Sequence, residues 1–351
     1  MLMMSIAHAW HRLPLISNHI FLESIVNITL LAGIVSMLYQ RRHADRNGSW
    51  DMLGFADQGS RESLFENFAP ILRTSMVLMY LFAFIAKLNY DFLNPEVSAA
   101  VKMYGDLTGR FPFLPQAPWA GYAAIWGTVV IEAAFPVLFA FRRFWKVGLV
   151  LGLLFHLMLG TVGHRTFSAL TFCMYFLFIS EDFLATVDTA RHWIRERFPV
   201  LFKYGKLIRA AVILSVFLLL IMNLMREKGI HIPLVGLNRY LLWLAGSCTL
   251  LGFYFVSMFF RSTRQPVPYS VRRPAFMWIP VLVMVFNGMC QYIGLKTEFS
   301  FTMYSNLRTE AGWNNHLFMP SWLKIAGYQE DVVEILDTTT MLLRSIVIET
   351  S

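Results

Sequence analysis

Three ionisable residues lie within or beside strongly apolar stretches of this sequence: Lys87, Glu132 and His156. An ionisable side chain in a hydrocarbon environment is costly unless it is paired or hydrated, so each of the three is a candidate for function. A lysine that is shielded from water releases its proton more readily and can then act as a base. A buried glutamate can serve as an acid or anchor a nearby cation such as Lys87, and a neutral imidazole can donate and accept hydrogen bonds.

Each of these residues also has a purely structural interpretation. Lys87 follows the apolar run Thr74–Ala86, so its long side chain could carry the amine to water at the membrane surface. Glu132 and His156 could instead form hydrogen bonds that only join helices. Pro136, four residues after Glu132, predicts a helix kink that frees a backbone carbonyl near the glutamate. The residue types alone leave both interpretations open.

The composition identifies the environment of these residues. Of the 351 residues, 56% are hydrophobic and 15% are charged, against about 25% charged residues in an ordinary soluble domain. The mean hydropathy is +0.52. Disorder, a fibrous rod and a small disulfide-linked domain are excluded, and a soluble enzyme is disfavoured. The three cysteines lie apart from one another within apolar runs, without metal-ligand spacing, so no metal site is predicted.

The sequence predicts an all-α bundle of about eight transmembrane helices, because a spanning helix needs about 20 mostly apolar residues. The predicted membrane domain covers residues 1–295, and residues 296–351 form an extramembrane tail that packs on its outer face. The eight candidate spans are Ser24–Gln40, Thr74–Ala86 with its flanks, Phe111–Phe141, Val147–Gly163, Thr166–Leu184, Ala210–Met225, Tyr240–Phe260 and Pro274–Leu295.

Basic residues in the connecting loops predict the orientation of the chain. With eight spans, the loops on one side contain 17 lysine and arginine residues and the loops on the other side contain 7. The positive-inside rule assigns the richer side to the cytoplasm and places both termini outside it. The net charge of +8 therefore reflects membrane orientation and does not indicate nucleic-acid binding. We expect an integral protein of a bacterial inner or plasma membrane, with the lipid bilayer as a partner.

Three segments outside the spans have recognisable patterns. Asn89–Trp119 is rich in proline and predicts an outer loop. Ser180–Arg209 is basic and amphipathic, which favours a surface helix against anionic headgroups. In the tail, Phe299–Met303 alternates like a short strand, and Asp331–Arg344 has apolar residues at helical spacing.

The tail segment Phe299–His316 carries aromatic and polar residues without a core of its own. We therefore expect it to fold back over the outer opening of the bundle, near Lys87 and Asn89–Trp119. There it would close the site from bulk water, as chemistry with a strong base requires.

Four short motifs follow one another along the chain. They are Phe84–Leu93, which contains Lys87-Leu88-Asn89-Tyr90-Asp91; Glu132 with Pro136; Phe155–Met158; and Phe301–Glu310, followed by Asn314, Asn315 and His316. The first resembles a signature of the vitamin K-dependent gamma-carboxylases, in which a helix ends in Lys-Leu-Asp/Asn-x-Asp-Trp. The other three resemble landmarks of the related bacterial HTTM proteins.

This resemblance implies a chemistry. In the carboxylases, a lysine at the position matching Lys87 deprotonates reduced vitamin K. Oxygenation then gives an epoxide and a base strong enough to remove a glutamate γ-proton, and carbon dioxide captures the carbanion. The resemblance implies a reduced vitamin K or menaquinone-type quinone as cofactor. It further implies catalytic roles for Lys87, Glu132 and His156, and substrate binding by Asn89, Asp91, Arg308, Asn315 and His316.

Two classes of function therefore stay open. The first is a quinone-dependent membrane enzyme, a carboxylase or an oxidoreductase, with Lys87 as the base. The second is a non-enzymatic membrane protein that binds a lipid, a quinone or a peptide, as in a bacteriocin-maturation or immunity system. Transport is a third option, although the sequence has no visible inverted repeat or pair of broken helices.

Overall fold

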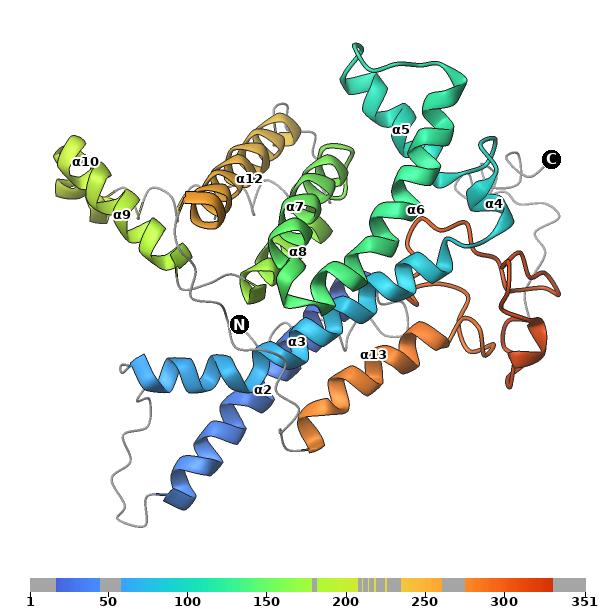
Figure 1. Cartoon of the computed structure of the whole chain (residues 1–351), viewed down its shortest axis with the longest axis horizontal. Coiled ribbons are helices and arrows are strands. Elements are labelled where there is room, and N and C mark those ends of the chain that lie inside the picture. The colour runs from blue at the N-terminus through green and yellow to red at the C-terminus, as the bar shows by residue number, and fades with distance from the viewer. Residues whose placement is uncertain are drawn as a thin grey trace. The chain divides into compact units, whose positions relative to one another are not determined.

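The computed structural model describes residues 17–44, 58–178, 182–207, 210, 214, 218, 225, 235–260 and 275–330. Every regular element in this part of the chain is a helix, as predicted (Figure 1). A single isolated antiparallel bridge, between Asn89 and His316, is the only β-type pairing among the described residues. The predicted helix Asp331–Arg344 and all but four positions of the predicted span Ala210–Met225 lie outside the described residues.

The α-helices fall into long and short groups. The long ones are α2 (Asn18–Ala44), α3 (Gln58–Ala86), α6 (Pro118–Ala140), α7 (Trp145–Thr161), α9 (Asp182–Arg197) and α12 (Val235–Phe260). The short ones are α4 (Tyr90–Leu93), α5 (Ala99–Arg110), α8 (Arg165–Tyr175), α10 (Pro199–Lys203) and α13 (Ile279–Met289). Four 3₁₀ turns accompany them: η1 (Arg142–Phe144), η2 (Phe176–Phe178), η3 (Ala275–Trp278) and η4 (Ser321–Leu323).

Four of the described helices are long and apolar enough to cross a membrane, as judged by length and composition. They are Asn18–Ser36, Phe68–Ala86, Pro118–Ala140 and Arg142–Thr161. Three shorter apolar helices cover Arg165–Phe178, Trp243–Val256 and Ala275–Met289. All seven overlap predicted spans. The chain therefore has the helices of an integral membrane protein.

Two predictions about the connecting segments are wrong. Asn89–Trp119 is not a loop throughout, because it contains α4 and α5. The proline-rich part, residues 111–117, lies between α5 and α6 and has the irregular backbone that the turn signals predict. Phe299–Met303 is not a strand, because Phe299 and Phe301 have φ angles of 61° and 62°, so the chain turns. The described part of Ser180–Arg209 is helical, as expected, but it forms two helices, α9 and α10, where one was predicted.

The chain divides into two compact units, and each is described by itself. The first contains the described residues of Met1–Ala32, Thr74–Pro136 and Pro274–Ser351. The second contains those of Gly33–Arg73 and Val137–Arg273. The boundaries fall inside α2, α3 and α6, so each of these helices contributes to both units.

In the second unit, glycines allow α7 to approach aromatic side chains closely. A Cβ atom at Gly152 would overlap Tyr175 of α8, and one at Gly160 would overlap Trp243 of α12. Small residues of this kind are common where membrane helices pack against each other. Between these glycines, His156 is completely buried, with its ring 5.4 Å from the ring of Phe167.

In the first unit, the irregular chain after α13, which we call the 296–330 segment, contacts the ends of three helices. Asn18, at the start of α2, accepts a hydrogen bond from the Phe301 N–H at 2.9 Å. Lys87, directly after α3, donates to the Met303 carbonyl at 3.1 Å. Asn287, near the end of α13, donates to the Phe299 carbonyl at 3.2 Å. Figure 1 shows this segment in orange to red beside α4.

Candidate functional site

Lys87 and Glu132 form a buried ion pair. The Lys87 Nζ lies 2.8 Å from Glu132 Oε2, and the two side chains are 5% and 9% exposed. Lys87 follows α3 and Glu132 belongs to α6, so the pair joins two helices of the first unit. A charge is tolerated in an apolar interior when an opposite charge lies beside it. The anchoring of Lys87 by Glu132, one of the sequence interpretations, is present, and the amine does not extend into the surroundings.

The other neighbours of the Lys87 amine also suit a positive charge. Besides Glu132, the amine donates to the Met303 carbonyl and lies 5.8 Å from the centre of the Phe92 ring. Phe92 is completely buried and packs with Ile125 and Val129 of α6. The amine is thus enclosed by a carboxylate, a carbonyl and an aromatic face, each of which attracts a cation.

Asn89 connects the end of α3, the short helix α4 and the 296–330 segment. Its Nδ2 donates to the carbonyls of Ala86 at 2.7 Å and Ser305 at 2.6 Å. Its Oδ1 accepts the Phe92 N–H at 2.8 Å and so caps α4, a role for which asparagine is preferred. Because Asn89 is completely buried and lies two residues after Lys87, these bonds fix the backbone that carries the lysine.

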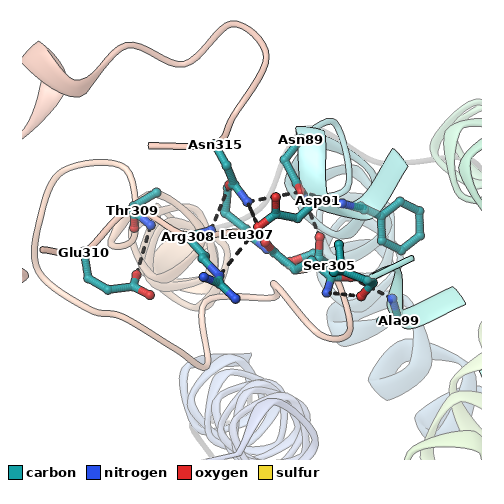
Figure 2. A network of polar contacts seen from close by, with 12 residues as sticks. Asn89, Asp91, Ala99, Ser305, Leu307, Arg308, Thr309, Glu310 and Asn315 are labelled. Atoms are coloured by element: carbon teal, nitrogen blue, oxygen red, sulfur yellow. Dashed lines mark hydrogen bonds and ion pairs between the residues drawn. The ribbon is translucent and has the colours of Figure 1, made fainter. Parts of the chain in front are cut away.

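A second polar cluster lies nearer the surface (Figure 2). Asn315 Nδ2 donates to Asp91 Oδ2 at 2.9 Å and to the Asn306 carbonyl at 2.8 Å, and Asn315 Oδ1 accepts the Arg308 N–H at 2.9 Å. The Arg308 Nε lies 3.5 Å from Asp91 Oδ2, with side-chain exposures of 68% and 33%. Figure 2 shows the Asn315 side chain directed toward Asp91 and Asn89, whereas Glu310 lies away from them. The cluster joins α4 to the 296–330 segment.

His316 fastens the 296–330 segment to the end of α3. Its Nε2 lies 2.9 Å from the Ile85 carbonyl, and its Nδ1 lies 3.3 Å and 3.1 Å from the N–H groups of Phe318 and Met319. This arrangement assigns the hydrogen to Nε2 and leaves Nδ1 as an acceptor, so the neutral ring fits. Burial lowers the pKa of His316, and the bond to the Ile85 carbonyl opposes this shift only in part.

The structure brings seven of the eight predicted site residues into the first unit: Lys87, Asn89, Asp91, Glu132, Arg308, Asn315 and His316. His156 belongs to the second unit and lies among aromatic rings. Lys87, Glu132 and His156 are all buried. Their catalytic roles, and the substrate-binding roles of the others, stay predictions.

Arg73 is a buried charge that is not among the predicted site residues. It lies within the apolar part of α3, is almost completely buried, and donates from Nε to the Leu177 carbonyl at 2.7 Å. Its guanidinium also lies 5.1 Å from the centre of the Trp145 ring. A charge inside an apolar run was the signal that could have identified it.

Three comparisons with known proteins were negative. No protein-family model matches the chain, and no curated protein or solved structure matches it. The resemblance to the gamma-carboxylases and HTTM proteins therefore rests on the short motifs alone. In the described part of the chain, no group of three or more His, Cys, Asp or Glu residues could hold a metal ion.

Proposed function

We propose that the chain crosses the membrane eight times, with both termini outside the cytoplasm. Asn18 at the start of α2 and Asn287 near the end of α13 both bond to the 296–330 segment, so these helix ends lie at the same level. If the start of α2 and the end of α13 lie on the same side of the membrane, the chain between them crosses the membrane an even number of times. Seven apolar helices are described from α2 to α13, and the predicted span Ala210–Met225 supplies the eighth.

Cysteine labelling tests this topology in a variant whose three native cysteines are replaced. Single cysteines at positions 50 and 205 should react only from the cytoplasmic side. Single cysteines at positions 105 and 320 should react with an impermeant reagent from outside. Labelling of position 320 from the cytoplasm would contradict the orientation.

We further propose that the protein is a membrane enzyme in which Lys87 acts as a base toward a reduced quinone, as in a carboxylase or an oxidoreductase. The observation that carries the proposal is the 2.8 Å pair of Lys87 and Glu132 in a buried site. Glu132 lies where it can hold the proton that the amine must first release. The hydroquinone O–H bond then breaks, its proton forms an N–H bond with Lys87, and the quinol oxygen keeps the electron pair.

A specific observation supports the non-enzymatic alternative. The Lys87 amine is enclosed by Glu132, the Met303 carbonyl and Phe92, so a substrate reaches it only when the 296–330 segment moves. In the alternative, the ion pair fastens this segment to α3 and α6. The protein then binds a lipid, quinone or peptide without chemistry, as a bacteriocin-maturation or immunity protein would.

The two candidates differ in what arginine can do at position 87. Arginine keeps the charge and can pair with Glu132, but it does not release its proton. The enzyme proposal predicts that Lys87→Arg and Lys87→Met both abolish oxygen-dependent consumption of a reduced naphthoquinone by purified, folded protein. Lys102→Met, which removes an exposed lysine of α5, is the matched control and should keep full activity. A fully active Lys87→Arg protein would exclude a role for Lys87 as a base. The non-enzymatic binding function would then be the remaining candidate.

A further inference from the structure

The last apolar helix is too short to cross a bilayer without the chain that follows it. Together, η3 and α13 have 4 and 11 residues, which is about 22 Å of helix at about 1.5 Å per residue. The hydrocarbon core of a bilayer is about 30 Å thick. Arg272 and Arg273 lie just before η3 and are assigned to the cytoplasmic side by the charge pattern. The helix therefore starts at the cytoplasmic side, and the remaining depth on the outer side has to be filled by the chain that follows Met289.

The 296–330 segment carries large apolar side chains on its surface. Trp313, Phe318, Trp322, Ile325 and Tyr328 are between 57% and 80% exposed. Several exposed side chains of this size within one short segment are unusual for a surface that faces water. Tryptophan and tyrosine are enriched where a membrane protein meets the headgroup layer, because their rings are apolar with one polar group.

Hydrogen bonds place this apolar surface at the level of two helix ends. The Leu317 N–H donates to the Leu88 carbonyl, just after α3, at 3.0 Å. The Ile325 and Ala326 N–H groups both donate to the Ile293 carbonyl, just after α13, at 3.1 and 3.3 Å. The side chains of Phe318 and Trp322 therefore project from backbone that is tied to the ends of membrane helices.

Several polar groups of the segment are satisfied by the protein itself. Irregular backbone is tolerated at membrane depth when the protein itself satisfies its polar groups. Asn89 and Gln329 donate to carbonyls of the segment and of Gln291, and His316 accepts two of its N–H groups. The segment contains three basic and three acidic residues, and Lys324 pairs with Glu330. It therefore carries no net charge.

We propose that the 296–330 segment lies in the outer interfacial layer of the membrane, with its exposed aromatic surface in contact with lipid. The bilayer is the partner because this surface follows directly on α13, whose Leu282 and Phe286 are exposed apolar residues of a membrane helix. Lys87 is then covered by a lipid-facing segment. The inference does not depend on any chemistry at Lys87.

Spin labels can distinguish lipid from water at individual positions. The protein would carry Trp322→Cys or Ile325→Cys in a background with Cys173, Cys248 and Cys290 replaced by alanine. It would be labelled with a nitroxide and reconstituted in phosphatidylcholine vesicles. Dissolved oxygen concentrates in lipid, whereas a nickel chelate stays in water. Lys102→Cys and Asp106→Cys, on the exposed polar face of α5, are the matched controls.

The proposal predicts that oxygen relaxes the labels at positions 322 and 325 severalfold more strongly than the nickel chelate does, with the opposite order at 102 and 106. Nickel accessibility at 322 and 325 equal to that of the controls would overturn it, because the segment would then face water. Low accessibility to both reagents, with spin–spin broadening between labels, would also overturn it, because a second copy would then cover the surface. Either result leaves the proton chemistry of Lys87 to its own test.

Discussion

Two ion pairs of the first unit have similar chemistry and very different surroundings. Lys87 and Glu132 approach to 2.8 Å with 5% and 9% of their side chains exposed. Arg308 and Asp91 approach to 3.5 Å, with 68% and 33% exposed. A surface pair contributes about 0–1 kcal/mol because water and salt screen it. In a buried pair each charge depends on the other, so the loss of one partner is severe. Lys87 and Asp91 are only four residues apart in the sequence. Burial, and not sequence position, therefore determines how much an ion pair contributes to stability.

Breaking the buried pair should have the largest effect. Glu132→Gln or Lys87→Met alone leaves an unpaired buried charge and should lower the free energy of unfolding by about 3–5 kcal/mol. The double variant, with neither charge, should recover much of this loss. Denaturant titration of the purified protein in detergent, analysed as a double-mutant cycle, measures the coupling. If the two single effects simply add in the double variant, the pair does not act as a unit.

Removing the Asn89 side chain should have the next largest effect. Asn89→Ala removes the cap of α4 and the donors for the Ala86 and Ser305 carbonyls, which should cost about 2–4 kcal/mol. Asn89→Ser keeps a capping oxygen without adding a charge and loses the amide donors, so it separates the two contributions. The same denaturant titration applies. An Asn89→Ala protein as stable as the parent would mean that α4 and the 296–330 segment are held by other contacts.

Protonation of His316 should make the stability of the protein depend on pH, with an effect of intermediate size. Its pKa is lowered in the folded protein, mainly by burial, whereas an unfolded histidine titrates near about 6.5. The contribution of the neutral His316 ring to the free energy of unfolding is therefore complete above about pH 6.5. It is lost as the pH falls below this value, by at most about 1.4 kcal/mol per pH unit.

Thermal unfolding in detergent between neutral pH and pH 5 measures this effect. His316→Ala should unfold more easily at neutral pH and show a weaker dependence on pH. His192→Ala, which removes an exposed histidine of α9, should keep the dependence of the parent. A parent protein that gains stability as the pH falls would contradict the assignment of a neutral His316 ring in the folded state.

Breaking the exposed pair should have the smallest effect. Arg308→Ala removes a screened ion pair and should change the free energy of unfolding by less than about 1 kcal/mol. Asp91 keeps its hydrogen bond from Asn315, so the cluster should persist. Added salt should reduce the difference between the two proteins further. A loss as large as that from Glu132→Gln would remove the distinction between the two pairs.

Much of the helical part of the first unit could be predicted from the sequence because apolar runs and helix signals are local. Thr74–Ala86 and Pro274–Leu295 are free of charged residues, and the described apolar helices Phe68–Ala86 and Ala275–Met289 overlap them. The pairing of Glu132 with Lys87 was foreseeable as well, because a buried charge requires a partner. The short helices within Asn89–Trp119 were not, because α4 depends on a cap whose other bonds reach the distant residue Ser305.

The path of the 296–330 segment could not be predicted for a different reason. Its acceptors and donors are often backbone groups, such as the Met303 carbonyl, and these exist at every position of a chain. Phe299 and Phe301 take up left-handed backbone conformations that their residue types disfavour. The Phe301 N–H is satisfied by Asn18, 283 residues earlier, and no periodicity connects the two.

These distant bonds also have a consequence for synthesis of the protein. The partners that Lys87 and Asn89 find in the 296–330 segment are each 216 residues further along the chain. At about 5–20 residues per second, translation reaches those partners about 10–40 s after α3 has been made. During that interval the donors of Asn89 and the end of α3 lack their final acceptors, while Glu132, made within seconds, is already present for Lys87. The ion pair can therefore hold α3 and α6 together while the ribosome is still completing the chain that will cover them.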